Sequence, residues 1–228
     1  DPMASLDPRM TVRELIREPL DIHKTGTTEE RNQAVEKIAE SVGISLDALE
    51  KYPHEFSGGQ RQRISIARAV VNRPELIVAD EPVSALDVSI QAQILNLLRS
   101  LKEELNLTFV FISHDLSVVR YFADEVAVMY LGNIVEYAPT EEIFSNPKHP
   151  YTQALISAVP HISTEAKRER IILSGDIPSP TDLPSGCHFH TRCPVATDQC
   201  SMETPTFELV APSHYASCLL LKAREKRL

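Results

Sequence analysis

The fold of this chain is decided by one stretch, Phe56-Ser57-Gly58-Gly59-Gln60-Arg61-Gln62-Arg63. Ser57 is a favoured helix N-cap, and apolar side chains recur at helical spacing after Gln60. Gly58 and Gly59 lack a Cβ, so backbone amides can approach a ligand closely. A helix N-terminus of this kind is suited to phosphate. Taken alone, the same letters describe an ordinary turn before a surface helix, so the interpretation depends on the sequence that follows.

An apolar run, residues 76–79, begins sixteen residues after Gln60 and ends in two acids, Asp80 and Glu81. Four apolar residues without a helical period predict a strand buried on both faces of a parallel sheet. Open α/β sheets bind ligands at the carboxyl ends of their strands, where one acid can hold Mg²⁺ and its neighbour can orient a water. Two acids at a strand end are otherwise often solvated termini.

Further periodic segments predict an α/β fold with a parallel sheet and helices on its faces. The predicted helices span residues 11–20, limited by Pro19, then 28–42, stopped by Gly43, and 89–105. The predicted strands span residues 108–112, followed by His114, then 125–130 and 134–137. A lone histidine after a strand is usually structural, and Asp87 by itself is a plausible helix N-cap.

In order and spacing, these motifs resemble the ATP-binding cassette family, the ATPase subunits of ABC transporters. The resemblance implies the P-loop NTPase-like α/β fold, with ATP and Mg²⁺ as ligands. It makes Asp80 the magnesium acid, Glu81 the general base and His114 the switch histidine that contacts the γ-phosphate. The turn of Ser57, Gly58, Gly59 and Gln60 would close on ATP held by a second ATPase subunit, and Asp87 would lie at the dimer seam.

The phosphate loop of this family, Gly-x-x-x-x-Gly-Lys-Ser/Thr, does not occur, because no glycine is followed by lysine. In the family, a stretch like the opening segment 1–10 follows a glutamine-bearing loop, with the phosphate loop further upstream. We therefore interpret the sequence as N-terminally truncated, and we expect the chain alone to lack meaningful ATPase activity.

The segment 146–155 resembles the start of the C-terminal extension of oligopeptide and dipeptide importer ATPases, and it favours that subgroup. Four cysteines follow, separated by five, six and seventeen residues: Cys187, Cys193, Cys200 and Cys218. Four thiolates suit a soft metal centre, either an iron–sulfur cluster or zinc, and the spacing alone does not choose. Resemblance to the peptide-importer motif favours a [4Fe–4S] cluster. Three histidines are spare ligands that keep zinc open: His188, His190 and His214.

Three regions are expected: a helical subdomain with the signature turn at residues 1–70, the later half of a RecA-like core at 71–144, and the cysteine-containing, loop-rich extension at 145–228. The family resemblance implies two transmembrane permease subunits and, indirectly, a solute-binding protein as further partners. It places the chain at the cytoplasmic face of the cell membrane.

Composition and charge exclude some classes of protein function. The net charge of −9 argues against a broad nucleic-acid surface. No stretch approaches the length of an apolar membrane span. Alternatives that stay open are a non-hydrolytic iron–sulfur interaction module, an ATPase for nickel or glutathione import, and a soluble ABC ATPase of translation or DNA repair. The last is disfavoured because long coiled-coil heptads are absent from the sequence.

Overall fold

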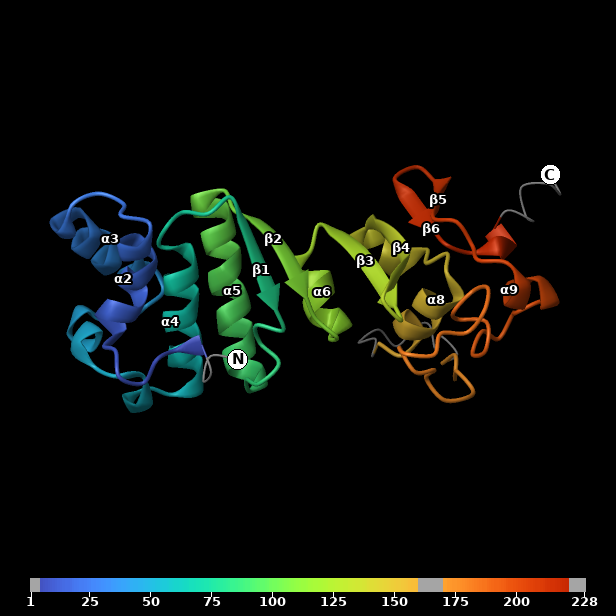
Figure 1. Ribbon diagram of the computed structural model, residues 1–228, viewed down its shortest axis with the longest axis horizontal. Coiled ribbons are helices and arrows are strands. Elements are labelled where there is room, and N and C mark those ends of the chain that lie inside the picture. The colour runs from blue at the N-terminus through green and yellow to red at the C-terminus, as the bar shows by residue number, and fades with distance from the viewer. Residues whose placement is uncertain (1–4, 160–169, 222–228) are drawn as a thin grey trace, which may run out of the picture. The chain divides into compact units, whose positions relative to one another are not determined.

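The computed structural model describes residues 5–159 and 170–221, so the first four residues of the opening segment lie outside it. The chain divides into two compact units, Asp1–His114 and Asp115–Leu228. Figure 1 labels the elements of both units along the chain. The predicted boundaries near residues 70 and 144 stay predictions.

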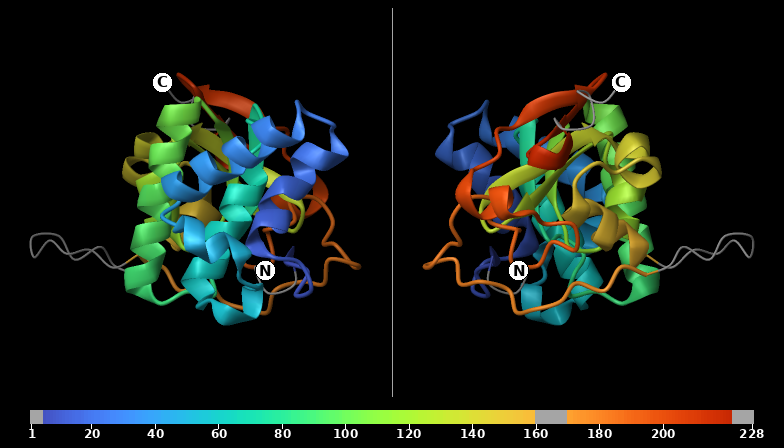
Figure 2. Two further views of the ribbon diagram at one scale, coloured as in Figure 1. Left: turned by 90° about the vertical axis from the view of Figure 1, so that its left-hand side faces the viewer. Right: turned by 90° about the vertical axis from the view of Figure 1, so that its right-hand side faces the viewer.

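Helices dominate the first unit. They are α2 (Val12–Ile22), α3 (Thr28–Ser41), η1 (Leu46–Glu50), η2 (Pro53–Glu55), α4 (Gly58–Val70) and α5 (Val88–Leu105). The predicted apolar faces are buried: Val12, Leu15 and Ile16 on α2, and Ile64, Ala67 and Val70 on α4. Helices α4 and α5 run alongside each other in the views of Figures 1 and 2.

Helix α2 is longer than the sequence suggested, because Pro19 does not end it. Pro19 lies inside α2, which continues to Ile22. Pro19 has no backbone N–H to donate to the preceding turn. Its carbonyl oxygen accepts the backbone N–H of His23 at 3.1 Å, and this bond closes the last turn. A proline this close to a C-terminus removes little of the hydrogen-bond ladder, so the predicted stop at residue 20 was wrong.

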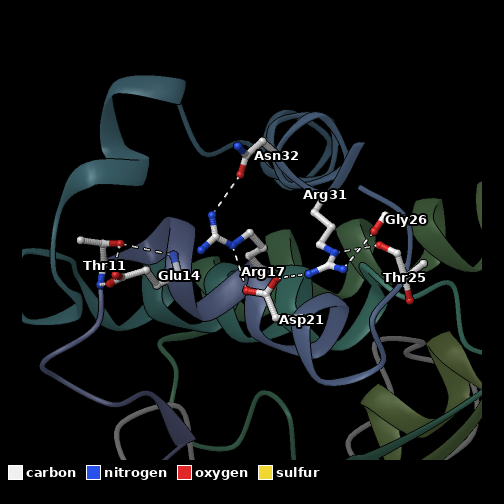
Figure 3. Close-up of polar contacts among 8 residues, drawn as sticks. All are labelled: Thr11, Glu14, Arg17, Asp21, Thr25, Gly26, Arg31 and Asn32. Atoms are coloured by element: carbon white, nitrogen blue, oxygen red, sulfur yellow. Dashed lines mark hydrogen bonds and ion pairs between the residues drawn. The ribbon is translucent and has the colours of Figure 1, made fainter. Parts of the chain in front are cut away.

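Two arginines tie α2 to α3 (Figure 3). Arg17 Nε lies 3.0 Å from Asp21 Oδ2, and Arg31 Nη1 lies 2.7 Å from Asp21 Oδ1. Arg17 also reaches Asn32 on α3, with Nη1 3.2 Å from the amide oxygen. Arg31 donates further to two carbonyl oxygens of the connecting loop, those of Thr25 and Gly26. The loop between the helices is therefore held through its backbone by the Arg31 side chain of α3.

Strands β1 (Leu76–Asp80) and β2 (Thr108–Ile112) form a parallel pair in which Leu76 is opposite Thr108. The expectation of burial on both faces was wrong. Ile77 and Ala79 are half-buried, whereas Val78 is 63 % exposed. Alternate residues point to opposite faces, and only one face of this pair is covered within the described part of the unit.

The second unit is built on an antiparallel sheet of order β3-β4-β6-β5. Its elements are α6 (Leu116–Phe122), β3 (Glu125–Tyr130), β4 (Asn133–Pro139), α7 (Thr140–Ser145), α8 (Pro150–Ser157), α9 (Asp198–Met202), β5 (Glu208–Ala211) and β6 (His214–Ala216). The predicted hairpin at 125–137 is thus confirmed, and it pairs with strands from the cysteine-containing tail. Phe189 of that tail is buried in one core with Val126, Val128 and Tyr130.

Across residues 5–159 and 170–221, no helix combines the length and apolar character needed to span a bilayer.

Candidate functional site

Glu81 and His114 meet beyond the carboxyl ends of β1 and β2. His114 Nδ1 lies 2.8 Å from Glu81 Oε1. This hydrogen bond, followed by the charge of His114, lowers the pKa of Glu81 below its usual value. Both side chains face solvent, with 74 % of the His114 and 45 % of the Glu81 side chain exposed. An ionised, accessible carboxylate fixed by a histidine is better suited to orienting a water than to strong proton abstraction.

The backbone holds Glu81 in an uncommon conformation. Its φ is +45°, in the left-handed region that side chains rarely adopt, and Pro82 follows it. The Glu81 amide donates to the carbonyl of Ile112 at 3.0 Å, which links the end of β1 to the end of β2. Such a conformation persists only where the surrounding structure enforces it, and residues of this kind cluster at functional sites.

Asp80 and Glu81 line a cavity of about 590 Å³ within the first unit. Its walls come from α4, from β1 and from the loop that follows the acids, with Ser65 and Ser84 among the polar contributors. No member of the Ser57–Gln60 turn is among the described residues that line this cavity. Glu81 thus contacts His114 and shares this cavity with Asp80, whereas the turn does not line it.

The turn begins α4 through a reciprocal cap. Ser57 Oγ accepts the Gln60 amide at 3.4 Å, and Gln60 Oε1 accepts the Ser57 amide at 3.0 Å. The hydroxyl expected to face a ligand is thus engaged within the turn. The helix N-terminus itself still supplies the partial positive charge that attracts phosphate.

Glycine lets this turn pack directly against the start of α5. A Cβ on Gly59 would lie 2.6 Å from Ile90 Cγ2, and one on Gly58 would lie 3.9 Å from Leu86 Cδ2. Asp87 occupies the N-cap position of α5 but makes no side-chain cap bond. The two helix starts that carry the turn and Asp87 are therefore neighbours, which agrees with a shared role at one surface.

The four cysteine thiols of the second unit lie within electrostatic range of one another. Burial, followed by hydrogen bonds and by neighbouring thiolates, sets the pKa of Cys218, which rises to about 11. The pKa of Cys187 and of Cys193 is also raised, chiefly by burial, and charge on Cys200 adds to each shift. Within the described residues, no group of three or more His, Cys, Asp or Glu side chains is placed to hold a metal ion.

Backbone amides nevertheless stabilise the thiolate form of three of these cysteines. The Cys187 sulfur accepts from the amides of Phe189 and His190, while Val195 donates to Cys193 and Leu220 to Cys218. Gly186 allows the loop to close, because a Cβ there would lie 2.4 Å from the Cys200 carbonyl oxygen. Four thiols of this kind are the donor type that soft metal centres use.

The three histidines proposed as spare ligands are engaged elsewhere through one ring nitrogen. His188 Nδ1 lies 3.0 Å from Asn133 Nδ2, and His190 Nδ1 lies 2.9 Å from the Cys187 carbonyl oxygen. His214 Nε2 lies 2.6 Å from Glu136 Oε1. One ring nitrogen of each of these histidines is thus committed to a partner within the protein.

Comparison with known proteins gives two family matches, to ABC transporter at residues 2–84 and to the C-terminal region of oligopeptide/dipeptide transporters at residues 135–200. The chain is 57 % identical to the oligopeptide transport ATP-binding protein AppF of Bacillus subtilis (strain 168), covering 96 % of this chain and 68 % of that protein. The chain belongs to the ATP-binding proteins of oligopeptide and dipeptide ABC transporters.

Other relatives agree with this family assignment. The dipeptide transport ATP-binding protein DppF of Haemophilus influenzae is 51 % identical over 96 % of this chain and 67 % of its own length. The dimeric structure of MJ0796, a bacterial ABC transporter cassette, superposes with a TM-score of 0.53 at 31 % identity, covering 60 % of each chain. The fold is therefore that of an α/β ABC ATPase cassette.

Sequence reasoning missed one polar group of this ABC protein. Glu136 is completely buried and accepts three hydrogen bonds: from the amide of Lys148 at 2.6 Å, from the amide of His149 at 2.9 Å, and from His214. A charged residue inside the otherwise apolar strand pattern of residues 134–138 was the available signal. Its partners lie up to 78 residues away, so no local pattern identifies them.

Proposed function

We propose that this chain forms part of the ATP-hydrolysing subunit of a transporter that imports oligopeptides or dipeptides. The observation that carries the proposal is the Glu81–His114 pair beside Asp80 at the ends of two parallel strands. The relatives named for oligopeptide and dipeptide transport support the substrate class.

Each residue of the site has a role in phosphoryl transfer to water. Asp80 would hold Mg²⁺, which neutralises charge on the phosphates when it is bound. The Glu81 carboxylate accepts a hydrogen bond from the attacking water and orients it. His114 fixes that carboxylate through Nδ1 and offers its other ring nitrogen to the γ-phosphate. Catalysis by such a site is mainly positioning and charge stabilisation.

The exposed turn and its neighbour suit a partner's nucleotide. The α4 N-terminus at Ser57, Gly58, Gly59 and Gln60 would bind the phosphates of ATP held by a second ATPase subunit, with Asp87 at the same seam. The placement of this turn outside the Asp80–Glu81 cavity supports a role across a dimer interface. Two permease subunits would hold the dimer at the cytoplasmic face of the membrane, and a solute-binding protein would deliver the cargo.

Glu81 and a matched surface carboxylate provide the test. In a full-length subunit that includes the phosphate loop of the family, assembled with its transporter, Glu81→Gln should lower ATP hydrolysis by about 10²–10⁴-fold. ATP binding should stay intact, because only the water-orienting carboxylate is lost. Glu103→Gln changes an exposed carboxylate of α5 in the same unit and should hydrolyse ATP normally. Near-normal hydrolysis by Glu81→Gln would sink the assigned role. Transport of nickel complexes or glutathione in preference to peptides would replace the proposed cargo.

We further propose that Cys187, Cys193, Cys200 and Cys218 hold one [4Fe–4S] cluster. All four thiols interact electrostatically, which is consistent with one shared site. The resemblance of the tail to the peptide-importer motif supports a cluster in preference to zinc. Anaerobic protein should carry about four iron and four sulfide per chain. Colourless protein with one stoichiometric zinc would instead support a Cys₄ zinc site.

A cluster-bearing interaction module without hydrolysis is the alternative function for the same chain. It predicts a stable cluster and no effect of Glu81→Gln on transport. The same two measurements therefore separate the alternatives.

A further inference from the structure

His149 lies where three segments of the second unit meet. It is the N-cap of α8, and its ring Nδ1 accepts the amide of Tyr151 at 3.1 Å. Its own amide donates to Glu136 Oε2 on β4 at 2.9 Å. Only 1 % of the residue is exposed. These bonds fix both the backbone and the ring plane of His149.

The hydrogen bond to Tyr151 also fixes which nitrogen carries the proton. Because Nδ1 accepts an amide, the neutral ring carries its proton on Nε2. The imidazole also hydrogen-bonds the backbone of Ser217, and Nε2 is the nitrogen that can donate to its carbonyl. Ser217 is the residue before Cys218, and its amide donates to Val135 on β4 at 2.9 Å. His149 therefore holds the chain directly next to one of the four cysteines.

The His149 ring also contacts the loop that carries Cys187 and Cys193. Phe189 lies between Cys187 and Cys193 in sequence, and its ring centroid is 5.7 Å from that of His149. Tyr130 and Tyr151 pack on other sides of Phe189, at 5.2 and 5.3 Å. Phe189 is 1 % exposed, so the position of the loop depends on what surrounds this ring.

We propose that His149 is a positioning residue for the four-cysteine site. It sets Cys218 and the Cys187–Cys193 loop at the separation that a thiolate-ligated cluster requires. This inference rests on the proposed cluster function. His149 is not itself a ligand here, because one ring nitrogen accepts from Tyr151 and the other carries the donated proton. Residues that orient metal ligands in this way commonly alter metal affinity by 10–100-fold when changed.

His149→Asn is the informative variant. An asparagine oxygen can still cap α8 through the Tyr151 amide, but the ring contact to Phe189 and the bond to Ser217 are lost. The reduced chain is loaded anaerobically with ferrous iron and sulfide in one arm and with cobalt(II) in the other. Thiolate-to-metal absorption and the rate of metal loss to a chelator are measured. We expect His149→Asn to lose metal about 10–100 times faster, with a changed absorption spectrum.

Two controls give the lower and upper limits of the expected metal loss, and a third variant tests the ring contact alone. His23→Asn makes the same substitution at an exposed position in the first unit and should match the wild type, while Cys218→Ser removes a ligand and should show the largest loss. His149→Phe keeps an aromatic ring against Phe189 without the hydrogen bonds, and it should give an intermediate rate. Amide hydrogen exchange in α8 and β4 reports whether each variant is folded.

The outcomes separate this inference from the proposed cluster. Wild-type spectra and chelator rates in both His149 variants would overturn the positioning role and leave the cluster intact. Absence of thiolate-to-metal absorption from the wild type in both arms would overturn the four-cysteine site, and the role of His149 with it.

Discussion

Each compact unit contains a glutamate hydrogen-bonded to a histidine, but solvent reaches only one of these pairs. Glu81 and His114 meet at 2.8 Å with about half or more of each side chain exposed. Glu136 and His214 meet at 2.6 Å with no exposure at either side chain. The same two chemical groups therefore face water in one unit and only protein in the other.

The difference indicates what each pair is for. An exposed pair gains little stability from its contact, because water and salt screen it, so its geometry is available for a ligand. A buried pair must satisfy its polar atoms internally, and Glu136 does so with two backbone amides as well as His214. This contrast supports the proposed role of the exposed pair in catalysis, whereas the buried pair is part of the interior of the second unit.

Removing the carboxyl group should give the largest contrast. Glu136→Ala leaves two buried donors and one partly buried donor without an acceptor, and we expect it to destabilise the second unit by roughly 3–5 kcal/mol. Glu81→Ala is the matched change in the exposed pair and should alter the stability of the first unit far less. Urea unfolding followed by peptide-resolved hydrogen exchange measures each unit separately. Similar losses from both substitutions would contradict the comparison.

The exposed pair could be predicted from the sequence, whereas the buried pair could not. Asp80, Glu81 and His114 follow apolar runs, so the sequence pattern places them after strands, and the family resemblance assigns them to one site. Glu136 interrupts a strand, and its partners at residues 148, 149 and 214 come from two distant segments. Contacts of that sequence separation depend on the tertiary fold.

Two errors about the fold have physical causes of the same kind. The apolar residues of β1 and β2 predicted burial on both faces, but hydrophobicity does not state which neighbouring element supplies the cover. Pro19 predicted a helix end, but three further residues of α2 are stabilised by packing of Leu20 and by the bond from His23. The outcome depended on the tertiary surroundings in both cases: one face of the strand pair is uncovered within the described residues, and Leu20 is packed at the end of the helix.

Lowering the pH should produce a smaller difference in stability between the two units. Burial lowers the pKa of His149 from 6.5 to about 4, while the charge of Glu136 opposes the shift. The unfolded chain therefore takes up a proton before the folded chain does. Stability is complete above about pH 6.5 and falls as the pH approaches 4, by about 3 kcal/mol for this group.

The acid effect is measured as the difference between wild type and His149→Asn, because other carboxyl groups titrate in both. Hydrogen exchange from pH 7 to 4 should show the second unit losing protection in the wild type beyond the loss in the variant. The Glu81 contribution has a different window, since its pKa lies below the ordinary 4.5, and it disappears only as the pH falls through that lower value. Identical acid profiles of wild type and variant would argue against a buried neutral His149.

The smallest expected effect is the stability contributed by the exposed pair. Its dependence on salt concentration distinguishes it from the contribution of the buried pair. A double-mutant cycle of Glu81→Ala and His114→Ala should give a coupling energy near the limit of detection, because long-range screening and side-chain entropy offset an exposed contact. In 1 M NaCl the Debye length falls to about 3 Å, and the coupling should vanish. The equivalent cycle of Glu136→Ala and His214→Ala should give a large coupling that salt leaves unchanged, because no ions reach the buried atoms. If the Glu81–His114 coupling were instead large and independent of salt, the pair would be a structural element, and its exposed geometry would no longer support a role in hydrolysis.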